Sequence, residues 1–139
     1  MSRLSRKLRK WVDPSSGREG VSYWCQGCDE MHRIVTKGPA PWTWNGDVNA
    51  PVFNPSVLYT AEKWVPPVTP RNLEQWRQSP WQQTKISFVC HTFVGCNGAK
   101  PGEVIFLRDC THQLAGTVQP FPDLPDYMQD QGEDTSHSI

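Results

Sequence analysis

Cysteine, histidine and aspartate residues gather at two places in this chain of 139 residues. Cys25 and Cys28 stand in Trp-Cys-Gln-Gly-Cys, where Gly27 permits a tight turn. The segments Cys90-His91 and Asp109-Cys110-Thr111-His112 follow in the second half of the chain. Two thiols with two residues between them can turn back on one ion, and two later thiols can complete a tetrahedron.

The spacing therefore predicts a structural metal site, with Zn²⁺ as the ion. The expected ligands are Cys25, Cys28, Cys90 and Cys110. An imidazole from His32, His91 or His112 could replace one of the thiolates. The alternative is that Cys90 and Cys110 are small buried apolar residues, as free cysteines often are.

Alternation along a strand separates these thiols from a second set of reactive groups. Successive strand residues point to opposite faces, so His91 diverges from Cys90, and Asp109 diverges from Cys110. If the thiols face a metal, His91 and Asp109 share the other face. A carboxylate beside an imidazole orients it and stabilises its charged form, as a general base requires.

The sequence offers two candidate nucleophiles for such a base. Ser56 lies between Pro55 and Val57 in an extended segment, and Thr92 follows His91 directly. Adjacent strand residues face apart, so Thr92 is badly placed for His91 and better placed for His112. We therefore expect Ser56 to attack, His91 to act as base and Asp109 to orient it. His112 is the second candidate base.

The elements that position these groups are mainly strands. Short β-branched and aromatic runs alternate with turn signals, and the chain holds 13 Pro and 10 Gly. The arms of one predicted hairpin are 86–94 and 103–107, with a long tip that holds Cys96. Thr69-Pro70 predicts a short helix over 70–78. The expected fold is a single small β-rich domain, stabilised by zinc, with one or two short helices.

Charge and proline mark the predicted boundaries. Residues 1–20 form a basic arm in which Leu4, Leu8 and Trp11 fit either a short amphipathic helix or a frayed terminus. The domain spans 21–125, with a Pro/Trp-rich insertion at 61–84 whose tryptophans we expect to cover the core. Residues 126–139 form an acidic tail that we expect to be disordered.

Composition narrows the classes of function. The formal net charge is zero, so no whole-molecule field favours nucleic acid or membrane, although the cations of the basic arm could contact phosphate. No apolar run approaches the roughly 20 residues of a membrane-spanning helix, and no secretory signal follows the basic start. Five cysteines without an export signal predict metal-bound thiolates in a reducing cytoplasm.

Five ordered motifs carry a family resemblance. They are Tyr23-Trp24-Cys25-Gln26-Gly27-Cys28, Trp42-Thr43-Trp44-Asn45-Gly46-Asp47, Phe53-Asn54-Pro55-Ser56, Cys90-His91-Thr92-Phe93-Val94, and the run from Phe106 to Gly116. Over about residues 21–120 the chain resembles a small phage and bacterial family of unknown function whose members are often mislabelled ammonia monooxygenase. Relatives encoded in bacterial ubiquitin-like conjugation operons are described as serine-type peptidases.

The resemblance implies a peptidase-like hydrolase that acts on ubiquitin-like or other protein substrates. It places Ser56 at the family's Pro-Ser, and His91, Asp109 and His112 match as well. Position 92 departs, because the family has serine in Cys-His-Ser-Phe and this chain has Thr92. The competing expectation is a non-catalytic zinc module, a phage accessory or virion-associated protein that binds a protein or peptide partner.

Overall fold

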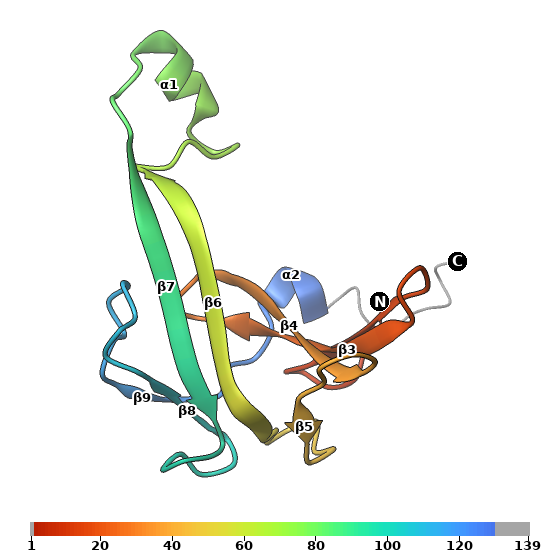
Figure 1. Cartoon of the computed structure of the whole chain (residues 1–139). Helices are drawn as coiled ribbons and strands as arrows, with labels where there is room; N and C mark the ends of the chain where they lie inside the picture. Colours follow the sequence, from red (N-terminus) through yellow and green to blue (C-terminus); the bar gives the residue numbers. More distant parts are fainter. Residues whose placement is uncertain (1, 130–139) are drawn as a thin grey trace.

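The computed structural model describes residues 2–129, which form two antiparallel sheets (Figure 1). The first sheet has the order β1 (Ser2–Arg3), β2 (Arg9–Asp13), β3 (Arg18–Cys25), β4 (Glu30–Lys37). The second has the order β5 (Thr43–Trp44), β6 (Phe53–Val65), β7 (Thr84–Val94), β8 (Glu103–Phe106), β9 (Val118–Pro120). Two short helices complete the described part, α1 (Leu73–Gln78) and α2 (Asp126–Gln129). The predicted β-rich class with one or two short helices is confirmed.

The core lies between the two sheets. Tyr23 on β3 is buried and stacks on Phe53 of β6, with ring centroids 6.0 Å apart. Phe121, which follows β9, packs on the same Tyr23 ring at 5.2 Å. The buried cysteines belong to this cluster, so the predicted metal ligands lie inside the core and not on a surface loop.

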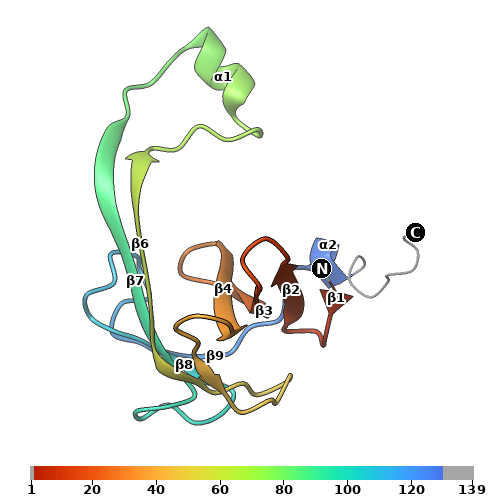
Figure 2. The ribbon, with the colours of Figure 1, turned by 45° about the vertical axis from the view of Figure 1, so that its right-hand side comes forward.

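The hairpin of β6 and β7 is the longest feature and extends well beyond the rest of the fold (Figures 1 and 2). The strands pair continuously from Val57–Thr92 to Val65–Thr84. Residues 61–65 and 84 therefore belong to the strands, and the predicted insertion is confined to 66–83, with α1 at the tip. Its tryptophans do not cover the core: Trp76 and Trp81 donate to Trp81 O and Pro66 O of the same segment.

Residues 2–20 contribute β1, β2 and the start of β3 to the first sheet, which corrects the prediction of a helix or a frayed arm. β2 pairs with β3, and both Leu8 and Trp11 are buried. The indole of Trp11 donates to Val21 O at 3.0 Å. The apolar spacing that suggested a helix arises because a turn separates Leu8 from Leu4, whose main chain donates to Leu8 O.

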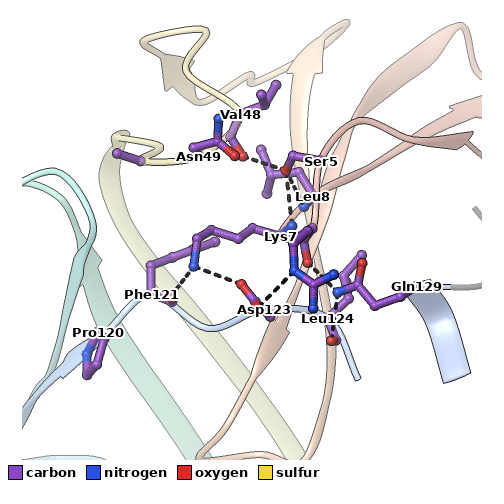
Figure 3. A network of polar contacts seen from close by, with 12 residues as sticks. Ser5, Lys7, Leu8, Val48, Asn49, Pro120, Phe121, Asp123, Leu124 and Gln129 are labelled. Atoms are coloured by element: carbon purple, nitrogen blue, oxygen red, sulfur yellow. Dashed lines mark hydrogen bonds and ion pairs between the residues drawn. The ribbon is translucent and has the colours of Figure 1, made fainter. Parts of the chain in front are cut away.

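Lys7 and Arg6 of the basic start are bonded to the segment that follows β9 (Figure 3). Lys7 donates to Phe121 O at 2.9 Å and lies 3.0 Å from an Asp123 carboxylate oxygen, and Arg6 contacts the other oxygen at 3.3 Å. The hydrogen bond from Lys7 lowers the pKa of Asp123. Ser5 also donates to Val48 O at 2.6 Å. Of the predicted disordered tail, residues 126–129 form α2, and the remainder lies outside the described residues.

Candidate active site and metal centre

A bulge in β6 presents the Ser56 hydroxyl. Phe53 pairs with Val94, and the next pair is Val57 with Thr92, so β6 holds two more residues than β7 over this interval. Such bulges re-aim side chains next to active sites. Here Val57 returns to the buried face, while Ser56 turns toward the outer face that also carries His91.

His91 connects this hydroxyl to a carboxylate. Its Nε2 lies 3.0 Å from Ser56 Oγ, and its Nδ1 lies 3.0 Å from Asp109 Oδ2. An ionised carboxylate only accepts hydrogen bonds, so in the neutral imidazole Nδ1–H donates to Asp109. Nε2 is then free to accept the proton of the Ser56 hydroxyl. The three side chains thus have the connectivity of a nucleophile, a base and an orienting acid.

The turn after β8 holds Asp109 in place. Leu107 N donates to His91 O at 2.9 Å, and His91 N donates to the Cys110 sulfur at 3.2 Å. The Cys110 thiol in turn donates to His91 O at 3.3 Å. Both main-chain groups of His91 are therefore bonded to residues on either side of Asp109, which positions this segment beside the imidazole.

Trp42 contacts the main chain of Ser56. Its indole donates to Ser56 O at 3.2 Å, and its own N–H donates to Val35 O of β4 at 2.8 Å. The bulge is thereby tied to the first sheet. Trp42 carried no catalytic signal in the sequence, because its role depends on a contact across the two sheets.

The second candidates for nucleophile and base lie on the inner face of the sheet. Thr92 is only 2% exposed and pairs with Val57, away from the imidazole of His91. His112 lies 3.3 Å from the Cys90 sulfur, so it adjoins the thiols and not Ser56. The prediction that strand alternation separates these two sets agrees with the geometry.

Four buried side chains could hold a metal ion: Cys25, Cys28, His32 and Cys90. The sulfurs of Cys25 and Cys90 are 3.8 Å apart, and the Cys28 sulfur is 3.3 Å from His32 Nε2. Two thiolates about 2.3 Å from a tetrahedral Zn²⁺ would themselves lie roughly 3.8 Å apart. The donor set and its spacing therefore fit a closed tetrahedral site.

This cluster joins the two sheets. Cys25 ends β3, Cys28 lies in the following turn, and His32 lies on β4 opposite Tyr23. Cys90 comes from β7 of the second sheet. A bound metal would cross-link the sheets at the residue next to His91, on the face opposite the Ser56 hydroxyl.

Cys110 is not in this group of four, unlike in the prediction, and His32 takes its place. Cys110 instead forms a second group with Cys90 and His112. Leu114 N donates to His112 Nδ1 at 3.2 Å, so in the neutral ring Nε2 carries the proton and points to the Cys90 sulfur. Cys110 is bonded to the main chain of His91. Both residues are therefore better described as supports around the cluster.

Ionisation of the thiols is strongly unequal. Hydrogen bonds from Cys28 and Cys90 lower the pKa of the Cys25 thiol far below its ordinary value. The bond to Cys25 raises the pKa of Cys28 to about 12, and the same partner raises the pKa of Cys90. A divalent cation would instead deprotonate the thiols that coordinate it.

Gly27 serves packing as well as the turn. A Cβ at this position would overlap the imidazole ring of His112, so no larger residue fits without displacing that ring. The knuckle between Cys25 and Cys28 therefore approaches the segment after Cys110 closely. The sequence suggested the turn but not this contact.

Comparison with protein families gives one match over residues 2–100, to the family described as bacterial ubiquitination-like system serine protease (BubE). The chain belongs to this family. The matched region includes Ser56, His91 and the four clustered metal-site residues, whereas Asp109 lies beyond it. Comparisons with curated proteins and with solved structures found no match. No helix within residues 2–129 is long and apolar enough to cross a membrane.

A site completed by His32 and a site completed by Cys110 predict different metal contents for two variants. We expect His32→Ala to lose the ion or to bind it about 10- to 100-fold more weakly, because it removes a ligand. Cys110→Ser should retain one equivalent of metal, measured by mass spectrometry of native protein. Loss of the ion in Cys110→Ser together with retention in His32→Ala would restore the four-thiolate set.

The sequence identified His32 only as one of three histidines that could replace a thiolate ligand. Its signal is the run Cys25-x-x-Cys28 followed after three residues by His32, which places three donors around one hairpin. The register then decides: His32 opposite Tyr23 faces the core beside Cys25, because alternate strand residues share a face. Register is not visible in a single sequence when the hairpin turn is irregular, and here the turn holds Asp29 at φ 57°.

Proposed function

We propose that this protein is a serine-type peptidase that hydrolyses an amide bond in a protein substrate of a bacterial ubiquitination-like system. The observation that carries the proposal is the chain of two 3.0 Å contacts from Ser56 through His91 to Asp109. The family to which the chain belongs supports it independently. His112, bonded to Cys90, has no part in the proposed reaction.

The proposed reaction follows from the direction of these bonds. Ser56 Oγ attacks the carbonyl carbon of the scissile amide, and its proton passes to His91 Nε2. His91 then protonates the leaving nitrogen, which breaks the C–N bond and leaves an acyl ester on Ser56. Water attacks this ester, again giving a proton to His91, which returns it to Ser56 as the product acid departs. Asp109 holds the Nδ1–H tautomer and stabilises the imidazolium without taking the proton.

We propose Zn²⁺ as the ion of the buried cluster, held by Cys25, Cys28, His32 and Cys90. When bound, it would supply a structural cross-link, because all four protein donors close the tetrahedron and leave no position for water. It faces the core, while Ser56 and His91 meet on the other side of the sheet. The chemistry therefore runs on side chains alone, and the metal supports β7 from behind.

Thr92 provides the sharpest test of which hydroxyl attacks. Thr92→Val replaces the hydroxyl with a methyl group of similar volume on the buried face, away from His91. The substrate is a ubiquitin-like precursor that bears a C-terminal extension. We expect the variant to cleave it at a rate within about twofold of the wild-type rate, with cleavage measured by intact-mass spectrometry. A nucleophilic Thr92 would require the opposite, a loss of cleavage in Thr92→Val. Absence of cleavage in the wild type, with the fold and metal intact, would favour a non-catalytic binding module.

A further inference from the structure

One edge of β6 lacks a neighbouring strand next to the nucleophile. β5 pairs only with Phe53 and Asn54, whereas β7 runs along the other edge as far as Val65. No other strand within residues 2–129 pairs with β6. The open edge therefore begins at the bulge that carries Ser56.

The main-chain groups at this edge can be assigned from β7. The N–H and C=O of His91 are bonded to Cys110 and Leu107, so they point away from β6. The N–H and C=O of Val89 are bonded to the Thr111 hydroxyl and the Thr111 N–H, and they point the same way. His91 and Val89 are thus the non-hydrogen-bonded positions of the antiparallel pair.

The main-chain N–H and C=O groups of their partners on β6 must then point toward the open edge of the sheet. Leu58 is opposite His91 and Thr60 is opposite Val89. In such pairs both residues direct their N–H and C=O groups away from each other, so those of Leu58 and Thr60 face the open edge. The register continues without a break to Val65, and the alternation extends to Glu62 and Trp64. An unpaired row of donors and acceptors is a template for another strand.

The place where this edge closes coincides with Ser56. The Ser56 carbonyl points to the same side and is taken by the indole of Trp42 at 3.2 Å. From there toward the N-terminus of β6, Trp42 and β5 occupy the edge. A strand added beside Leu58 and Thr60 would therefore end its pairing at the nucleophile.

We propose that the substrate is an extended peptide segment that adds as a strand to the open edge of β6, over Leu58 to Trp64. The scissile bond then lies at the end of the paired segment, at Ser56. This inference rests on the proposed peptidase function and names its substrate conformation. Strand addition binds through main-chain bonds and leaves alternate side chains to give selectivity.

Leu58 supplies a side-chain contact at this position. It stands opposite His91 on the outer face, where it is 56% exposed. A substrate strand about 4.8 Å away would bring its own outward side chains alongside Leu58. An apolar substrate residue near the scissile bond fits this neighbour.

Amide methylation of a substrate tests strand addition. The probe is an octapeptide selected by cleavage from a randomised octapeptide library, and each non-scissile amide on both sides of the cleaved bond is N-methylated in turn. Main-chain hydrogen bonds between a substrate strand and the edge of β6 recur at every second substrate residue. We therefore expect each methyl group at alternate amides, on one side of the scissile bond, to lower kcat/KM about tenfold. The intervening amides should tolerate the methyl group. Equal cleavage of every methylated peptide would overturn strand addition.

Thr60→Pro gives the matching change in the protein. Proline removes the N–H that faces the open edge and no bond to β7, whereas Thr60→Val keeps this N–H and serves as the control for loss of the hydroxyl. We expect Thr60→Pro to lower kcat/KM about tenfold and to abolish the effect of one N-methyl position, with Thr60→Val unchanged. The loss of that one position's effect distinguishes a removed edge bond from a general loss of fold.

The peptidase function and the strand addition of the substrate can be tested separately. Cleavage that depends on Ser56 but shows no alternation overturns strand addition and leaves the peptidase standing. No Ser56-dependent cleavage of any library peptide or precursor, by folded and metal-bound protein, overturns both.

Discussion

Replacing Ser56 with alanine is expected to lower kcat/KM for a cleaved precursor by about 10⁴-fold or more, because the attacking atom is removed. His91→Ala should cost about the same, since the hydroxyl loses the base that its 3.0 Å contact provides. The double variant should be little worse than either single one, because the residues act as one unit. Rates are measured under single-turnover conditions with metal content verified.

A matched control uses a serine on the same face of the sheet. Ser87 lies on β7, is exposed and pairs with Glu62 away from His91, so Ser87→Ala should leave the rate unchanged. Asp109→Ala should reduce the rate less than Ser56→Ala, because the orienting acid alone contributes less than the nucleophile. A Ser56→Ala variant with wild-type activity would exclude this residue as the nucleophile.

Removing the metal is expected to destabilise the protein by at least about 3 kcal/mol, since closed zinc sites contribute directly to folding. Cys25→Ser should lower the midpoint of thermal unfolding by roughly 10 °C or more. The core would lose its cross-link between β3 and β7, beside His91. Cleavage should fall with the loss of fold. Calorimetry, metal analysis and activity are measured on the same samples.

Cys96 supplies the control for thiol removal. It lies in the loop between β7 and β8, outside both cysteine and histidine groups, and its thiol donates to Phe53 O at 3.3 Å. Cys96→Ser should keep the metal and most of the stability. Equal destabilisation by Cys25→Ser and Cys96→Ser, with metal absent from the wild type, would show that the protein has no structural metal site.

The strands could be predicted where their patterning is local, and less well where they depend on distant partners. The hairpin over 84–94 and 103–106 follows from β-branched runs with a Gly-rich tip. Leu4, Leu8 and Trp11 fit a helix in isolation, but Leu8 and Trp11 are buried by strands contributed later in the chain. The length of β6 beyond residue 60 could not be predicted, because no residue from Leu58 to Val65 is buried and prolines follow directly at 66 and 67.

The pairing of His91 with Asp109 could be predicted from the sequence because it depends on alternation along a strand. Cys90 and His91 must face apart on any regular strand, and the placement of His91 with Asp109 followed. The register shift that brings Ser56 to His91 could not be predicted from the sequence, because a bulge is defined by the pairing of both strands. The exchange of Cys110 for His32 has the same origin: Cys110 is held by the His91 main chain, a contact across the sheet.

Covalent labelling by a fluorophosphonate shows whether Ser56 is a nucleophile activated by His91. The Ser56 oxygen would displace fluoride at phosphorus while His91 takes the hydroxyl proton, leaving a stable phosphonyl ester. We expect one label per chain, located at Ser56 by peptide mass spectrometry, and none in folded, metal-bound His91→Ala. A wild-type protein that cleaves its precursor yet carries the label elsewhere, or carries none, would contradict the assignment of Ser56 and His91.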